Sequence, residues 1–141
     1  MNFKFFCALA RLCPYQFFSS SAFRNLRNDP DFCDVRLAVK DRSRPLKAHK
    51  VVLSSCSPYF SSLLREMNAE QQNSLSPFYI MMRGVTHSQL SGILDFMYYG
   101  EANVAQEDLD QFLALAEELQ VGFLSSTRKY SFLISKKYSR K

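Results

Sequence analysis

The sequence predicts one small domain of the α+β class, in which short strands and helices follow one another along the chain. Its 141 residues are 47% hydrophobic and include 13 Phe and 7 Tyr, enough for one hydrophobic core. Within residues 46–56 the hydrophobic period changes from the alternation of a strand to the spacing of a helix. Breaks at Pro30, Pro58, Pro77 and Gly100 separate the elements before and after this stretch.

A first helix is expected from Tyr15 to Arg27, because large apolar side chains recur there at near-helical spacing. These side chains are Tyr15, Phe17, Phe18, Ala22, Phe23 and Leu26. Pro30 disfavours helix at the residue before it, so the helix should end by Asn28. Residues 1–13 are expected to form an N-terminal extension. Their apolar run is shorter than the roughly seven to fifteen residues that a secretory signal needs.

Two strands should follow, over residues 33–39 and 46–50. In the first, one face carries the apolar side chains of Cys33, Val35, Leu37 and Val39. The loop between the strands, residues 41–45, is rich in basic residues. We expect a solvated hairpin turn there, with nucleic-acid contact as the weaker alternative.

The chain then changes to two successive helices. Apolar residues fall at helical spacing over residues 51–56, and a second apolar stripe ends at Met67. Between the two helices, Ser57 suits an N-cap, and Pro58 suits the first helical position, where its missing N–H costs nothing. The polar residues 68–76 are expected to form a loop.

The remaining elements are a strand and two helices. A strand is expected over residues 78–82. Thr86 and Gln89 have the spacing of a capping box, which predicts the start of a helix that Gly100 ends. The last helix should span residues 107–119, because apolar residues recur there at helical spacing behind an acidic first turn.

No enzymatic motif is present in the sequence. It contains no nucleophile elbow, phosphate-binding loop or zinc-protease motif, and only four glycines. His49 could be placed in a triad with Asp34 and Ser54. A single histidine at a strand end is far more often a structural hydrogen bonder, so we predict that the protein is not an enzyme.

The four cysteines, Cys7, Cys13, Cys33 and Cys56, show no paired spacing. This usage is typical of a reducing compartment and of small buried side chains, so no metal ion and no other cofactor is expected.

Charge is distributed unevenly along the chain. Residues 1–127 hold 12 Lys and Arg against 13 Asp and Glu, whereas residues 128–141 hold six basic residues and no acidic ones. The net charge of +5 therefore belongs to the C-terminal tail. Residues 125–141 are expected to be a basic tail or a linker, and any binding of nucleic acid by them should be nonspecific.

Four short motifs resemble, in order, those of a BTB/POZ domain. They are Asp34-Val35, Ala48-His49-Lys50, Val52 to Phe60 and Tyr98-Tyr99-Gly100-Glu101. Each motif is short, but the combination is specific and places the domain at residues 14–124. The resemblance implies a helical cluster flanked by a short mixed sheet, with an N-terminal dimerisation helix. Residues 97–109 are similar to the arthropod branch, in which such domains often begin transcription regulators.

The resemblance also implies roles for individual residues. A homodimer interface would use Tyr15, Phe18, Ala22, Phe23 and Leu26. A charged pocket beneath a lateral groove would use Asp34 and Lys50, and structural roles fall to His49, Tyr98 and Gly100. The alternatives are that the first helix folds wholly onto its own core, and that Asp34 and Lys50 form an ordinary surface ion pair.

Two functions are compatible with this resemblance. The first is a nuclear transcription-regulator module that dimerises with itself or with other BTB proteins and recruits corepressors. The second is a substrate adaptor that binds the cullin scaffold of a ubiquitin ligase in the cytoplasm. Adaptors carry an apolar-x-Glu box after the second helix, and here Glu70 fits that box whereas Asn68 departs from it. Neither specific nucleic-acid binding by the domain alone nor membrane association is expected.

Overall fold

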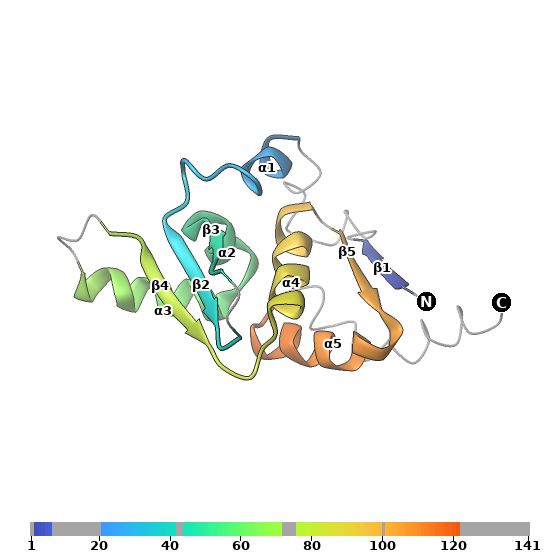
Figure 1. Cartoon of the computed structure of the whole chain (residues 1–141). Helices are drawn as coiled ribbons and strands as arrows, with labels where there is room; N and C mark the ends of the chain where they lie inside the picture. The colour runs from blue at the N-terminus through green and yellow to red at the C-terminus, as the bar shows by residue number, and fades with distance from the viewer. Residues whose placement is uncertain (1, 7–20, 42–43, 72–75, 100, 122–141) are drawn as a thin grey trace.

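A computed structural model describes residues 2–6, 21–41, 44–71, 76–99 and 101–121, with the backbone alone at residues 2–6, 21–23 and 101. The elements in chain order are β1 (Asn2–Phe6), α1 (Ser21–Leu26), β2 (Val35–Val39), β3 (Leu46–Ala48), α2 (Lys50–Cys56), α3 (Pro58–Glu70), β4 (Phe78–Met82), α4 (His87–Tyr99), β5 (Glu101–Ala105), the 3₁₀ turn η2 (Gln106–Asp108) and α5 (Leu109–Glu118). Helices and two small sheets are mixed along the chain, so the predicted α+β class is confirmed (Figure 1).

The larger sheet has the strand order β3-β2-β4. Strands β2 and β3 form the predicted antiparallel hairpin, with Val35 opposite Ala48, whereas β4 runs parallel to β2, with Val35 opposite Phe78. Alternate residues of β2 and β4 are buried, as expected for a sheet with one covered face. In Figure 1 these strands lie in front of α2 and α3, which cover that face.

The core lies between this sheet and the helices. Apolar side chains from β2, β4, α2, α3, α4 and α5 form one continuous buried cluster. Its largest fully buried members include Tyr98, Phe60, Phe112, Leu37 and Leu53. Tyr98 is the only one of these five with a hydroxyl, so the polar contacts of that hydroxyl matter for the site described below.

Two predicted helix starts are confirmed. The Ser57 hydroxyl accepts a hydrogen bond from the Phe60 amide at 3.1 Å and donates one to the Leu119 carbonyl, which ties α3 to the end of α5. At α4, the Thr86 side chain accepts from the Gln89 amide and the Gln89 side chain accepts from the Thr86 amide, both at 3.2 Å. These are the two reciprocal bonds of a capping box.

The boundaries of two helices differ from those expected. Lys50 was expected at the end of a strand, but it is the first residue of α2, because the Asp34 carboxylate accepts the Lys50 amide at 2.7 Å and the backbone turns there. Asn68, Ala69 and Glu70 were expected in a loop, but they form the last turn of α3, whose polar side chains face solvent.

The second sheet was not predicted. Strand β5 follows α4 directly and pairs antiparallel with β1, with Ala102 opposite Phe5 and Val104 opposite Phe3. Ala102 and Val104 are buried and Asn103 is exposed, which is the alternation typical of a strand. The segment is too short for this alternation to distinguish a strand from a loop in the sequence. Among the described residues, no helix is long and apolar enough to cross a membrane.

Candidate functional site

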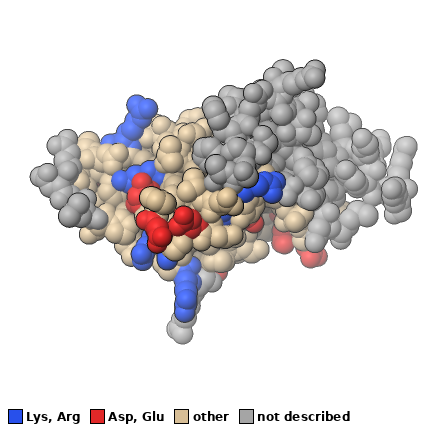
Figure 2. Space-filling view, turned by 90° about the horizontal axis from the view of Figure 1, so that it is seen from above, with Lys and Arg blue, Asp and Glu red and all other residues tan. Residues whose placement is uncertain are grey.

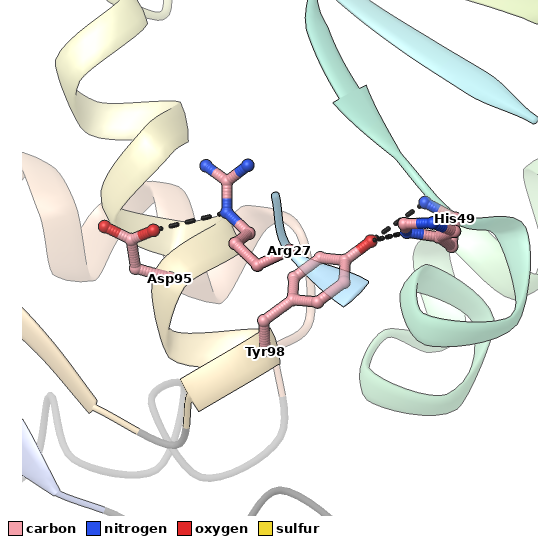
Figure 3. A network of polar contacts seen from close by, with 4 residues as sticks. All are labelled: Arg27, His49, Asp95 and Tyr98. Carbon is pink, nitrogen blue, oxygen red and sulfur yellow. Dashed lines mark hydrogen bonds and ion pairs between the residues drawn. The ribbon is translucent and has the colours of Figure 1, made fainter. Parts of the chain in front are cut away.

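A polar seam runs from the end of α1, along α4, to the junction of β3 and α2. It joins Arg27, Asp95, Tyr98, His49 and Cys33, which come from four segments of the chain (Figure 3 shows the first four residues). Every buried side-chain nitrogen and oxygen in the described part of the chain has a hydrogen-bond partner. The seam therefore holds polar groups in the interior without the cost of leaving them unpaired.

The centre of the seam is the contact between His49 and Tyr98. The Tyr98 oxygen accepts the His49 amide at 2.9 Å and lies 2.6 Å from His49 Nδ1. In the neutral tautomer with its hydrogen on Nε2, Nδ1 accepts the Tyr98 hydroxyl proton while the Tyr98 oxygen accepts the His49 amide. Burial raises the pKa of Tyr98 and lowers the pKa of His49, so both groups stay uncharged at neutral pH.

Cys33 continues the seam toward solvent. Its Sγ lies 3.8 Å from His49 Nε2 and 3.4 Å from the Asp29 carbonyl oxygen, so it can accept from the imidazole and donate to the backbone. Burial raises the pKa of the Cys33 thiol, with Lys47 opposing that effect. The sequence predicted a buried apolar cysteine, which is confirmed for Cys56 (3% exposed), whereas Cys33 is half-buried and makes these polar contacts.

Two arginines attach the end of α1 to α4. Arg27 Nε lies 3.3 Å from Asp95 Oδ1, and the Arg27 guanidinium lies 5.7 Å from the centre of the Tyr98 ring. Arg24 donates to the Tyr99 carbonyl at 3.3 Å and lies 5.7 Å from the centre of the Tyr99 ring. Burial raises the pKa of Asp95, and the Arg27 charge and hydrogen bond oppose that effect. Among the described side chains at this end of α1, Arg24 and Arg27 therefore make a polar attachment to α4, beside the apolar packing of Leu26.

The residues expected to form a charged pocket, Asp34 and Lys50, lie together. Their contact joins the Asp34 carboxylate to the Lys50 amide, while Lys50 Nζ lies 3.3 Å from Asn68 Oδ1 and 3.5 Å from the centre of the Phe78 ring. Asp34 is exposed and Lys50 is half-buried. Asp34 therefore supports the start of α2, and its role in a partner-binding pocket stays a prediction.

The residues expected at a dimer interface are only partly covered by the structure. Leu26 is half-buried against the core, and Ala22 and Phe23 lie in α1, where the backbone alone is described. Tyr15, Phe18 and the structural residue Gly100 lie outside the described residues. The sequence analysis did not single out Arg24, Arg27 or Asp95. The spacing of the two arginines could have indicated their role, because residues three apart fall on one face of a helix and both lie near the end of an apolar one.

The contacts of the seam are structural in character. Among the described residues the His49 ring is hydrogen-bonded to Tyr98 and Cys33, and neither Asp34 nor Ser54 is one of its hydrogen-bond partners. No group of three potential metal ligands occurs in the same part of the chain. What the seam can do chemically is fix the relative positions of α1, α2 and α4. On the face seen in Figure 2, acidic and basic side chains lie close together, so that face has no single sign of charge.

Comparison with known proteins gives relatives in Drosophila melanogaster. The chain is 45% identical over 107 residues to "Longitudinals lacking protein-like", covering 76% of this chain and 78% of that protein. It is 43% identical over 111 residues to "Broad-complex core protein isoforms 1/2/3/4/5", covering 79% of this chain but 14% of that protein. It is 45% identical over 101 residues to "Protein abrupt", covering 72% of this chain and 10% of that protein. The chain thus spans a small part of two of these relatives and most of the third.

Solved structures with the same fold include two BTB domains. The BTB domain of zebrafish PATZ1 superposes with a TM-score of 0.64 at 24% identity, covering 86% of this chain and 90% of that one. The BTB domain of human gigaxonin gives a TM-score of 0.59 at 19% identity, covering 79% and 83%. The model of the BTB/POZ domain family matches residues 23–135. The predicted resemblance is thereby confirmed, and the chain belongs to the BTB/POZ domain family.

Proposed function

We propose that this chain is the protein–protein interaction module of a transcription regulator and forms homodimers through its N-terminal helix. The observation that carries the proposal is the polar attachment of α1 to α4. Arg24 and Arg27 hold the end of α1 through Tyr99, Asp95 and Tyr98, so its orientation does not require its apolar side chains to enter the core. Of those side chains, Leu26 is half-buried against the core.

The sequence of the expected helix supports the same proposal. Phe17, Phe18, Phe23 and Leu26 are more large apolar groups than one helix can bury against a domain of this size. A two-fold dimer would bury the same apolar patch from both chains. In this arrangement the seam fixes the direction of the helix, and the partner chain covers its apolar side.

The second part of the proposal concerns partners beyond the homodimer. Membership of the BTB/POZ family and the Drosophila relatives support a nuclear protein that pairs with other BTB proteins and recruits corepressors. The contact between Asp34 and Lys50 would border the corepressor site. Any whole-protein activity would depend on sequence that the longer relatives contain and the aligned region does not cover.

The role of a cullin adaptor takes second place. Asn68 stands where the adaptor box is apolar, and its side-chain oxygen lies 3.3 Å from Lys50 Nζ. Asn68 and Glu70 both lie on the exposed last turn of α3. An amide that is engaged with a lysine is a poor anchor for an apolar cullin contact, because inserting it into such a contact would break that hydrogen bond.

Light scattering coupled to gel filtration tests the dimer. At micromolar concentration the chain should give about twice the 16.3 kDa mass of one copy, as an isologous dimer requires. The double substitution Phe18→Asp and Phe23→Asp should give monomers or aggregates, because it places charges in the proposed apolar interface.

The matched control is Val51→Asp, at a side chain that is 63% exposed on α2 and distant in sequence from α1. It should keep the dimer mass. Circular dichroism of each variant separates loss of the dimer from loss of the fold. A folded wild-type chain with the mass of one copy would contradict the homodimer.

A further inference from the structure

The outer face of the β3-β2-β4 sheet carries a cationic and apolar surface that neither the core nor α1 uses. The strand register places Lys47, Arg36 and Tyr79 in one row across the three strands, and Ala38 and Met81 in the next. Tyr79 is 57% exposed and Met81 is 61% exposed. Exposed large apolar side chains at successive positions on one face of a strand are unusual on a monomer surface unless something binds them.

The charges on this face are mostly of one sign. Residues at alternate positions share a face of a strand. Lys40 and Arg83, one position beyond the ends of β2 and β4, therefore lie on the same face as Arg36 and Met81. Together with Arg36 and Lys47 they give four cations. Among these alternate positions of the described strands, Asp34 carries the one carboxylate. That carboxylate already accepts a hydrogen bond from the Lys50 amide. Residues 1–127 together hold slightly more acidic than basic residues, so this concentration of cations is local.

The middle of the face has a shape suited to a side chain from outside. Ala38 is small and lies in register with Met81, between the longer side chains of Arg36 on the same strand and Lys40 just beyond the end of that strand. An apolar side chain could therefore rest on Ala38 and Met81. On either side of it, carboxylates would be within reach of the cations, which for Arg favours paired hydrogen bonds.

We propose that this outer sheet face, defined by Arg36, Ala38, Lys47, Tyr79 and Met81, binds an acidic peptide segment of a partner protein that carries apolar side chains between its carboxylates. A second copy of the chain is disfavoured as occupant, because two such faces would bring cations against cations. A nucleic acid is disfavoured by the geometry of Tyr79. The Arg36 guanidinium lies 5.7 Å from the centre of the Tyr79 ring and donates to its hydroxyl at 3.2 Å, so a base that stacked on this ring would compete with a cation already bound to it.

This surface is separate from α1, so the proposal goes beyond dimerisation and can fail or hold independently of it. A suitable probe is a synthetic peptide that alternates glutamate and leucine, compared with one that alternates glutamine and leucine. Binding is followed by the NMR signals of the Met81 methyl group and of the Arg36 and Lys47 amides. The glutamate peptide should shift these signals, and its affinity should fall with added salt.

Charge reversal tests the cations directly. The double substitution Arg36→Glu and Lys47→Glu should weaken binding of the glutamate peptide by about tenfold or more, because like charges then face each other. Arg65→Glu, at an exposed position of α3, is the matched control and should leave the affinity unchanged. Met81→Ser should weaken binding, whereas Val51→Ser, at an equally exposed apolar side chain, should not.

Several results would overturn the proposal. One is the absence of any shift of the Met81 methyl signal at millimolar peptide, and another is equal affinity for the glutamate and glutamine peptides. Tighter binding of a single-stranded oligonucleotide to the same residues would assign the face to nucleic acid. A fall in particle mass caused by Met81→Ser would assign it to self-association. The variant with Phe18→Asp and Phe23→Asp should still bind the peptide, which distinguishes failure of the dimer from failure of this site.

Discussion

Two adjacent residues, His49 and Lys50, make hydrogen bonds of similar length in very different surroundings. The His49 side chain is buried, 4% exposed, and its contacts with Tyr98 lie in the interior. The Lys50 amide bonds to the carboxylate of Asp34, which is exposed. Water can replace the Asp34 carboxylate but cannot reach the Tyr98 hydroxyl. Similar geometry should therefore give unequal contributions to the free energy of unfolding.

The largest effect is expected from Tyr98→Phe. This change removes the hydroxyl and leaves the amide and Nδ1 of His49 buried without that partner, which should lower the free energy of unfolding by about 1–3 kcal/mol. Urea denaturation measures the loss. Tyr79→Phe is the control, because its hydroxyl bonds to Arg36 on the exposed outer face and its loss should cost less than about 0.5 kcal/mol. Equal losses in the two variants would show that burial does not distinguish these hydroxyls.

A smaller effect should appear as a pH dependence. Burial lowers the pKa of His49 in the folded chain below its ordinary value of 6.5, with the Asp34 and Asp29 charges opposing that shift. The unfolded state therefore binds more protons below pH 6.5, so stability is complete above that value and falls as the pH falls through the lowered folded pKa.

The slope contributed by His49 cannot exceed about 1.4 kcal/mol per pH unit. It is measured from urea midpoints between neutral and mildly acidic pH, with His49→Gln as the comparison. If the variant keeps the same slope as the wild type over this interval, the acid sensitivity belongs to other groups.

The smallest effect is expected from Asp34→Ala. An interior ion pair with Lys50 would make this change cost about 3–5 kcal/mol. Asp34 is instead exposed and accepts a backbone amide at the start of α2, so the loss should be about 1 kcal/mol, as for a helix cap. A double-mutant cycle with Lys50→Ala distinguishes the two cases. Additive effects are expected, because Lys50→Ala keeps the backbone amide that bonds to Asp34. Strong coupling between the two substitutions would instead indicate an ion pair between the side chains.

The sequence predicted the parts of the fold that depend on local chemistry. Ser57 and Pro58 start α3, Thr86 and Gln89 start α4, and the alternation in β2 assigns the buried face, all as expected. These signals are local because a cap or a strand face is determined by residues close together in the chain.

The parts that sequence reasoning missed depend on contacts between distant residues. Strand β5 is short and is defined by pairing with β1, about a hundred residues earlier, which no local pattern contains. Lys50 belongs to α2 because its amide donates to the carboxylate of Asp34, which lies immediately before β2 and 16 residues earlier in the chain. In the seam, His49 was expected to be a structural hydrogen bonder, but its partners Tyr98 and Cys33 are separated from it by 49 and 16 residues.

The parallel pairing of β2 with β4 has a consequence for how the chain folds. Neighbouring parallel strands need a long crossover, and here the crossover contains β3, α2 and α3. The entropy of closing that loop must be offset before the contacts between Val35 and Phe78 contribute any stability. The hairpin of β2 and β3 can form early from neighbouring residues, whereas the sheet is complete only when both helices are in place. We therefore expect the outer sheet face to assemble late in folding, together with the core behind it.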